Sequence, residues 1–237
     1  MGIPFIIGVT GHRNLREQDI PKLRELVFAE LKKLMSWYPD LDFFMLNSAA
    51  SGADILCARI ALELGMKLVC PLPMPAEEYR RDFSKADSSE FDALIQKADD
   101  VFVTPAAEPV PENAARDFYY RQAGIYVASH SHLLLSLWDG RAGEPDGCGT
   151  AETVGFVLNG NDKDKTGSFK AANAGAVLHI LTPRQTAGTE ERISVRLIEN
   201  EPGRLREVLR MLDTLNANAA TAAENRAAAR CLQRRTE

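Results

Sequence analysis

The sequence predicts an α/β protein built on a doubly wound, mostly parallel sheet of about six to seven strands, with helices on both faces. Short apolar runs of strand length recur along the chain, and segments with the apolar spacing of helices separate most of them. Near-continuous apolar runs are typical of strands buried on both faces of a parallel sheet. Several of these runs stop at glycine and polar residues, which is how strands of such sheets end beside a ligand site.

Seven segments have the length and composition of strands. The first six are apolar, whereas the seventh alternates apolar and polar side chains, as an edge strand does. The direction of this seventh strand stays open, and an antiparallel one fits its pattern. The expected strands cover residues 5–9, 42–47, 67–70, 100–103, 133–138, 176–181 and 193–198.

Helical spacing connects most of the strands. Asp19 and Pro21 mark the start of the first helix, which ends near Trp37. Its apolar face is expected to contain Ile20, Leu23, Val27, Leu31 and Leu34. Further helices are expected over residues 54–64, 77–83, 89–98, 116–129, 150–158 and 205–215. Three prolines, at positions 71, 73 and 75, are expected to break regular structure between the third strand and the next helix.

The composition indicates a globular, soluble protein. A length of 237 residues allows one large domain or two small ones, and 45% apolar residues allow a full hydrophobic core. A net charge of −5, with acidic and basic residues interspersed, argues against a nucleic-acid partner. The four cysteines have neither zinc-site spacing nor the density of a disulfide scaffold. No stretch approaches the roughly 20 apolar residues of a membrane span, so we expect a cytoplasmic protein. We also expect neither a metal ion nor a cofactor.

We expect residues 1–200 to form a ligand-binding domain and residues 201–237 to form a C-terminal helical extension. Residues 205–215 are amphipathic, whereas residues 216–230 are rich in alanine and have almost no large apolar side chains. A helix that buries so little is marginal alone. We therefore expect the extension to dock on a partner domain or on a second copy of the chain, or else the chain is the cytosolic part of a longer protein.

Polar residues follow the first predicted strand at the end where a ligand would bind. Thr10, Gly11, His12 and Arg13 offer a hydroxyl, a backbone that can approach an anion, an imidazole that titrates near neutrality and a guanidinium suited to phosphate. A second interpretation stays open, in which His12 and Arg13 are exposed turn residues.

The loop after the second strand enters a helix through small residues. Ser51 and Gly52 place backbone amides at the helix N-terminus, which favours an anion. Asp54 then either accepts a hydrogen bond from a ribose hydroxyl or helps to cap its helix. Both roles fit the sequence.

The fifth strand ends at Asp139 and Gly140, and a glycine-rich turn leads from it into another helix. This turn repeats the phosphate-friendly arrangement and contains Gly147, Gly149 and Thr150. Cys148 lies in the same turn, but no base is identifiable beside it, so a nucleophilic thiol is the less favoured interpretation.

The histidines have structural and metal-binding interpretations. His130 and His132 flank the entry to the fifth strand, but no third ligand stands at a recognisable spacing, which favours packing or hydrogen bonding over a metal pair. His179 lies within an apolar strand and is expected to be a hydrogen-bonded core residue. The chain has no Gly-Lys-Ser/Thr after a glycine-rich turn and no GxGxxG after its first strand, so the standard phosphate fingerprints are absent.

Taken together, three motifs resemble the SLOG superfamily of Rossmann-like domains. They are Val9 to Arg13, Ser51 to Asp54 before an alanine-containing helix, and Leu137 to Gly140 before residues 147–154. The resemblance covers residues 5–184. The group includes DNA-processing protein A, the lonely-guy cytokinin-activating phosphoribohydrolases and sensor domains for nucleotides or nucleotide-derived signals. It implies a Rossmann-like sheet whose strand ends hold such a ligand.

The resemblance also implies where catalysis would lie. Lonely-guy enzymes carry an Arg-Lys pair on the helix before the glycine turn and a glutamate three residues after its Gly-Thr. Arg121 lies near the first position but two residues further from the strand, and Thr153 occupies the second, with Glu152 one residue early. Nucleoside 2-deoxyribosyltransferases, a neighbouring group, place a nucleophilic glutamate at the same position. A helix turns about 100° per residue, so we expect the Glu152 carboxylate to point elsewhere, and Thr153 cannot replace it.

The leading hypothesis is a sensor or regulatory module that binds a nucleotide or a nucleotide-derived molecule. The phosphates would be contacted by Gly11, Arg13, Ser51, Gly52, Gly149 and Thr150, and the ribose or base by Asp54, Asp139 or Glu152. One alternative is hydrolysis of the N-glycosidic bond of a nucleoside monophosphate, or a deoxyribosyltransferase-like reaction, with Glu152 as acid or nucleophile and Arg121 orienting the phosphate. Another is a structural module that assembles through the C-terminal helix.

Overall fold

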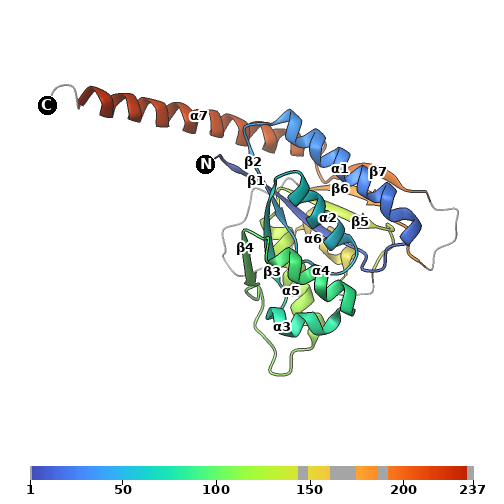
Figure 1. Ribbon diagram of the computed structural model, residues 1–237. Helices are drawn as coiled ribbons and strands as arrows, with labels where there is room; N and C mark the ends of the chain where they lie inside the picture. Colours follow the sequence, from blue (N-terminus) through green and yellow to red (C-terminus); the bar gives the residue numbers. More distant parts are fainter. Residues whose placement is uncertain (1, 144–148, 161–174, 186–191, 234–237) are drawn as a thin grey trace.

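A seven-stranded sheet in the order β4-β3-β2-β1-β5-β6-β7 forms the centre of the protein (Figure 1). The computed structural model describes residues 2–143, 149–160, 175–185 and 192–233. The first six strands are parallel, and β7 pairs antiparallel with β6 at one edge, which confirms the fold class and the antiparallel option for the last strand. The strands are β1 (Pro4–Gly11), β2 (Asp42–Leu46), β3 (Lys67–Leu72), β4 (Asp100–Val103), β5 (Leu133–Trp138), β6 (Ala176–Leu181) and β7 (Ser194–Glu199).

Helices cover both faces of this sheet, so it is doubly wound. The helices α1 (Ile20–Trp37), α2 (Ala53–Glu63) and α4 (Lys85–Ile95) pack into one hydrophobic cluster, and α5 (Arg116–His130) and α6 (Thr150–Asn159) pack into a second. Alternate residues of β5 divide between the two clusters, with Leu135 in the first and Leu134 in the second. Successive side chains of a strand point to opposite faces, which is why a continuous apolar run serves both cores.

The order of the strands reverses beside β1. From β1 the chain builds β2, β3 and β4 in one direction, then crosses back to place β5 on the other side of β1. The register pairs Gly11 with Leu137, so β1 and β5 end together. Ligands of open parallel sheets bind outside the carboxyl ends of the strands at such a switch point.

The first helix begins where the sequence predicts, but its buried face begins one turn later. Ile20 is 38% exposed, whereas Leu23, Val27, Leu31 and Leu34 are buried. Helical spacing places Ile20 and Leu23 on the same face. The spacing does not reveal that the first turn of α1 lies outside the core, because that depends on where the sheet ends.

The third strand continues through Pro71 to Leu72, so the expected break at this proline was wrong. The Val69 carbonyl accepts a hydrogen bond from the Asn47 N–H, whereas the Leu72 carbonyl accepts one from the Thr104 N–H on the opposite side. Pro71 therefore faces the same side as Val69, toward β2, and β2 has already ended at Leu46. The missing N–H of proline therefore falls at the position where the ladder to β2 ends.

Short helices connect the third strand to α4, and a long helix closes the chain. α3 (Ala76–Tyr79) and the 3₁₀ turn η2 (Arg80–Asp82) precede α4, and the 3₁₀ turn η1 (Glu17–Asp19) precedes α1. The last helix, α7 (Arg204–Gln233), buries Leu205, Val208, Leu209 and Leu212 in the larger cluster. Beyond residue 216 it extends away from the sheet (Figure 1), and residues 217–221 are exposed.

Candidate functional site

A cavity of about 570 Å³ lies at the carboxyl ends of β1 and β5, at the switch point of the sheet. Its volume is within the range of small-molecule sites. Residues from both faces of the molecule line it, because the loops after β1, β2 and β3 meet α5, α6 and the segment after β6 at this edge. The polar or charged lining residues include Thr10, His12, Arg13, Ser48, Asp54, Asp117, Arg141, Thr150, Glu152, Thr153 and Arg184.

All four residues predicted after the first strand line the cavity. Glycine at position 11 allows the strand to approach its neighbours, since a Cβ there would overlap the side chain of Ala53 and lie 2.8 Å from the carbonyl oxygen of Leu137. The Arg13 guanidinium lies 4.8 Å from the ring centre of Tyr120. Stacking of a cation on an aromatic ring restrains its direction, so Arg13, although exposed, is held beside the cavity.

The start of α2 packs against the loop after β1 instead of presenting free amides. The Ala53 N–H donates to the His12 carbonyl at 3.0 Å. A Cβ on Gly52, whose φ is +77°, would overlap the Arg13 carbonyl oxygen. Neither Ser51 nor Gly52 lines the cavity. The glycine at position 52 is therefore required by the close approach of two backbones.

Asp54 lies at the base of the cavity and is buried. Its Oδ2 accepts a hydrogen bond from the Ala50 N–H at 3.2 Å. Burial raises the pKa of Asp54 to about 7, against the opposing effects of the Ala50 N–H and the Arg13 charge. Asp54 thus caps the loop before its own helix and also faces the cavity, so the two roles predicted for it coexist in one geometry.

Asn47, which the sequence analysis did not single out, fixes the loop between β2 and α2. Its Oδ1 accepts from the Ala49 N–H at 2.7 Å, and its Nδ2 donates to the Asp54 carbonyl at 2.9 Å. These bonds hold Ala49 at φ +55°, a conformation that is costly for alanine. A polar residue directly after an apolar strand and before small residues was the available signal.

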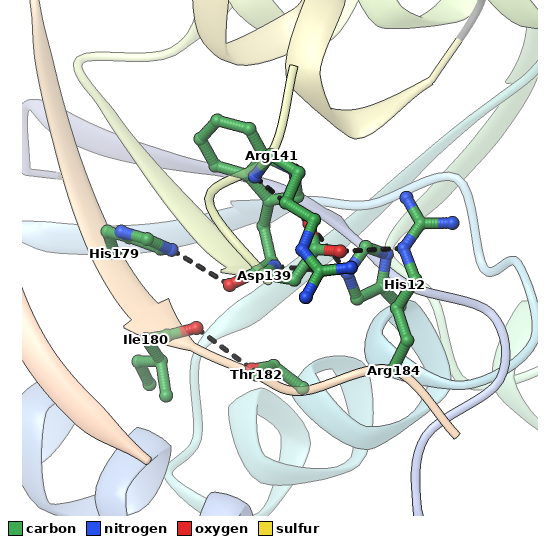
Figure 2. Close-up of polar contacts among 8 residues, drawn as sticks. His12, Asp139, Arg141, His179, Ile180, Thr182 and Arg184 are labelled. Carbon is green, nitrogen blue, oxygen red and sulfur yellow. Dashed lines mark hydrogen bonds and ion pairs between the residues drawn. The ribbon is translucent and has the colours of Figure 1, made fainter. Parts of the chain in front are cut away.

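Asp139 forms the centre of a polar network at the end of β5 (Figure 2). Its Oδ2 accepts from Arg184 Nε at 2.7 Å, and its Oδ1 accepts from the Arg141 N–H at 3.2 Å. Burial alone would raise the pKa of Asp139, but these hydrogen bonds, together with the nearby His12 and Arg184, outweigh it and hold the pKa below its usual value. Both carboxylate oxygens are therefore engaged within the protein, which leaves Asp139 less suited to contact a ribose than the sequence suggested.

His12 supports this network as a neutral ring. The Asp139 N–H donates to His12 Nε2 at 3.0 Å, so Nε2 presents its lone pair. Burial lowers the pKa of His12, and the nearby Asp139 carboxylate reverses only part of that effect. His12 therefore fixes the backbone of Asp139 rather than pairing with its carboxylate as a cation.

The first turn of α6 forms the opposite part of the lining, with Gly149, Thr150, Glu152 and Thr153. From the sequence we expected the Glu152 carboxylate to point elsewhere, but Glu152 lines the cavity. Its Oε1 lies 2.9 Å from Nε of Arg121 on α5. The Thr153 hydroxyl donates to the Gly149 carbonyl at 3.3 Å, which completes the turn of the helix rather than offering an acid.

The predicted site residues fall into three groups. Those that line the cavity are Thr10, Gly11, His12, Arg13, Asp54, Gly149, Thr150 and Glu152. Those outside the lining are Ser51, Gly52, Asp139, Gly140 and Arg121, of which Asp139 and Arg121 bind lining residues. Gly147 and Cys148 lie outside the described residues.

Several lining residues escaped the sequence analysis, among them Arg141, Arg184, Asp117 and Tyr120. Arg184 follows Thr182 and Pro183 at the end of β6, a position that the strand-end rule could have indicated. Tyr120 and Asp117 lie on α5, where helical spacing does not reveal that one end of the helix reaches the cavity.

The three histidines away from the cavity have structural roles. His132 Nδ1 accepts from the Ile6 N–H at 2.9 Å, and His130 Nδ1 lies 2.8 Å from the Tyr126 carbonyl. His179 bonds with Nε2 to the Trp138 carbonyl and accepts at Nδ1 from Arg196. These contacts confirm the hydrogen-bonding interpretation. Within the described residues, no three histidine, cysteine, aspartate or glutamate side chains gather in a way that could hold a metal ion.

Comparisons with known proteins add likenesses of fold. No protein-family model and no curated protein matches the chain. Among solved structures, it is similar to DNA processing protein A from Streptococcus pneumoniae, at 16% identity and a TM-score of 0.38 over 56% of this chain, and it spans 41% of that protein's chain. It is also similar to the molybdenum cofactor carrier protein from Chlamydomonas reinhardtii, at 14% identity and a TM-score of 0.35 over 91% of this chain and 86% of the other.

The described part of the chain contains no helix that is both long and apolar enough to cross a membrane.

The sheet order and the helices on both faces are those of the Rossmann-like fold that the resemblance to the SLOG superfamily implies.

Proposed function

We propose that the protein binds a nucleotide or a nucleotide-derived small molecule in the cavity at the switch point, as a sensor or regulatory module. One observation carries this proposal: Arg13, Arg141 and Arg184 line a single cavity together with the first turn of α6. Guanidinium groups and helix N-termini both favour phosphate oxygens. Such a cluster of cations around a cavity of this size suits a small phosphorylated ligand.

The remaining lining residues suit the uncharged part of such a ligand. Tyr120 and Trp138 offer aromatic surface for a base, and Asp54 and Glu152 offer carboxyl oxygens for ribose hydroxyls. Gly149 and Thr150 bring the backbone of α6 to the phosphate. In this proposal Asp139 acts through Arg184 and does not contact the ribose, because both of its oxygens are engaged.

Thermal unfolding with a panel of nucleosides and their mono-, di- and triphosphates tests this function. A ligand present at about 100 times its Kd stabilises by about 2.7 kcal/mol. We expect nucleotides to raise the Tm more than nucleosides do. Arg13→Gln and Thr150→Val should reduce this shift, whereas Arg81→Gln, an exposed arginine on η2 outside the lining, should preserve it. Equal shifts for nucleosides and nucleotides would contradict the proposal.

A second candidate function is cleavage of an N-glycosidic bond, favoured by the 2.9 Å ion pair between Arg121 and Glu152 beside the cavity. In this reaction water replaces the base at the anomeric carbon, and the base leaves with a proton. Glu152 would act as the nucleophile, and Arg121, which lies outside the lining, would hold its carboxylate in place instead of orienting the phosphate as the sequence suggested. Release of free base from a nucleoside monophosphate, abolished by Glu152→Gln, would establish the enzyme. Binding without release favours the sensor.

The third candidate is a structural module. It predicts no thermal shift with any member of the panel, together with self-association through α7. Sedimentation of the purified protein separates it from the two ligand-binding functions, because neither of those requires assembly.

A further inference from the structure

We propose that Arg184 binds the anionic group of the ligand and that Asp139 is the residue that positions it. This inference rests on the proposed function, because it assigns a role within the same cavity. It concerns the segment between β6 and β7, to which the sequence motifs gave no function. The two residues come from different strand ends, 45 positions apart in the sequence, and their side chains meet in a hydrogen bond (Figure 2).

The Asp139–Arg184 ion pair is asymmetric in its exposure. The Asp139 side chain is 1% exposed, whereas that of Arg184 is 54% exposed. A buried carboxylate is costly without a cation, so Asp139 needs its partner. An arginine with half of its side chain in solvent has no comparable need to be fixed. The buried carboxylate of Asp139 therefore fixes the direction of a guanidinium that stays accessible to solvent.

Arg184 bonds to Asp139 through Nε, and this choice leaves the edge formed by its two terminal nitrogens available. Nε donates to Asp139 Oδ2 at 2.7 Å. Within the described residues, neither terminal nitrogen of this guanidinium has a hydrogen-bond partner. The two terminal N–H₂ groups present a planar edge that matches two oxygens of a phosphate, and Arg184 lines the cavity.

The backbone on both sides of the pair is also held in place. The Thr182 N–H donates to the Trp138 carbonyl at 2.8 Å, and Arg184 forms a bridge with Leu15 in the loop after β1. Gln185 Nε2 donates to the Leu15 carbonyl at 3.2 Å. On the other side, His12 fixes the backbone of Asp139. The backbone that carries Arg184 and the backbone of Asp139 are thus both restrained, so the Arg184 guanidinium loses less conformational entropy when a ligand binds.

The test measures inorganic phosphate and AMP against adenosine, with binding followed by calorimetry or by nuclear magnetic resonance titration. We expect Arg184→Ala to weaken the Kd for phosphate and for AMP by at least about tenfold. Adenosine should bind Arg184→Ala as it binds the wild type. Arg184→Lys should recover only part of the lost affinity, because an ammonium lacks the two-nitrogen edge. Arg81→Gln is the matched control and should change none of these values.

A double-mutant cycle tests the positioning role of Asp139. Asp139→Asn should weaken phosphate binding in the wild-type background and have no further effect in Arg184→Ala. A residue that only supports the fold would lower affinity equally in both backgrounds, and that additive result would overturn the positioning role. The retained adenosine affinity and the Tm of each variant report on folding independently.

The outcomes separate this inference from the proposed function. If AMP binds the wild type and Arg184→Ala equally well, the assignment of Arg184 is wrong and the proposed function stands. If phosphate binds in an Arg184-dependent manner but no nucleotide does, the assignment of Arg184 stands and the proposal that the ligand is a nucleotide is wrong. If neither phosphate nor AMP binds the wild type, both are wrong.

Discussion

Asp54 and Asp139 lie beside the same cavity, yet the pKa values of their carboxyl groups are shifted in opposite directions. Burial dominates at Asp54, whose Oδ2 bonds to a single backbone N–H, and raises its pKa to about 7. Asp139 is also buried, but Arg184 Nε and the Arg141 N–H bond to its two oxygens and lower its pKa. The difference comes from the number and charge of the hydrogen-bond donors around each carboxylate.

Asp54→Asn is expected to stabilise the protein more in mild alkali than in acid. The folded state keeps the Asp54 proton up to about pH 7, whereas the unfolded chain releases it near 3.8. The folded state therefore binds more protons between these values, so the stability contributed by Asp54 falls as pH rises through this window. The variant escapes this loss, and its free energy of unfolding relative to wild type should rise by about 2 to 4 kcal/mol between about pH 4 and about pH 8.

Urea unfolding at the two pH values measures this difference. Asp139→Asn serves as the contrast, because a lowered folded-state pKa contributes stability above the unfolded pKa that is lost as pH falls. Asp139→Asn should therefore be most destabilised near neutrality. A relative stability of Asp54→Asn that does not change with pH would show that Asp54 is ionised in the folded protein at neutral pH.

At the scale of single elements, the contact between the loop after β1 and the N-terminus of α2 decides the shape of the site. Gly11 and Gly52 let these two segments approach until the Ala53 N–H reaches the His12 carbonyl. That contact brings Asp54 beside the cavity while Arg13 stacks on Tyr120. The glycines that the sequence assigned to phosphate contact thus have a packing role, and Gly52 does not line the cavity.

Gly52→Ala is expected to cost about 2 kcal/mol or more in free energy of unfolding, because the new Cβ would meet the Arg13 carbonyl at a backbone angle that alanine rarely adopts. Gly155→Ala within α6 is the matched control. A Cβ at position 155 meets nothing within 4 Å, so this change should be neutral or stabilise by up to about 1 kcal/mol. The denaturant midpoint at constant slope gives both values, and equal effects would contradict the close approach.

Most helices and strands could be predicted from the sequence because periodicity and apolar runs report burial directly. The sequence failed where the burial of one residue depends on a neighbouring element. Pro71 fits in β3 because β2 ends before it, and Ile20 is exposed because the first turn of α1 lies beyond the core. The site was predictable where it follows strands, at Thr10 to Arg13 and at Gly149 to Glu152, but not on α5, where Asp117 and Tyr120 lie.

At the scale of the whole molecule, α7 joins the core along its first part and then leaves it. Leu205, Val208, Leu209 and Leu212 are buried, and Asn216 bonds to the Ile3 N–H and to the Asp40 carbonyl. Residues 217–221 are exposed, and the helix extends away from the sheet beyond that point (Figure 1). The structural contribution of the helix is therefore expected to end near Asn216.

A chain that ends after residue 216 should unfold with a free energy within about 1 kcal/mol of the full chain, because residues 217–221, where α7 leaves the domain, are exposed. Leu209→Ala should cost about 2 to 5 kcal/mol in both chains. Urea unfolding gives the stabilities, and sedimentation of the two chains shows whether residues 217–237 hold a second copy. A large loss of stability in the shortened monomer would show that the outer part of α7 packs on the domain.

The sequence by itself determined the doubly wound class of the fold, its seven strands and the strand ends that carry polar residues, because these follow from periodicity and from the residues that end each run. Only the tertiary structure decided which of those residues reach a ligand. In the folded protein Asp139 holds Arg184, Gly52 allows two backbones to pack closely, and Arg121 pairs with Glu152. The physical reason is that these roles depend on distances between segments far apart in the chain, which local patterns do not encode.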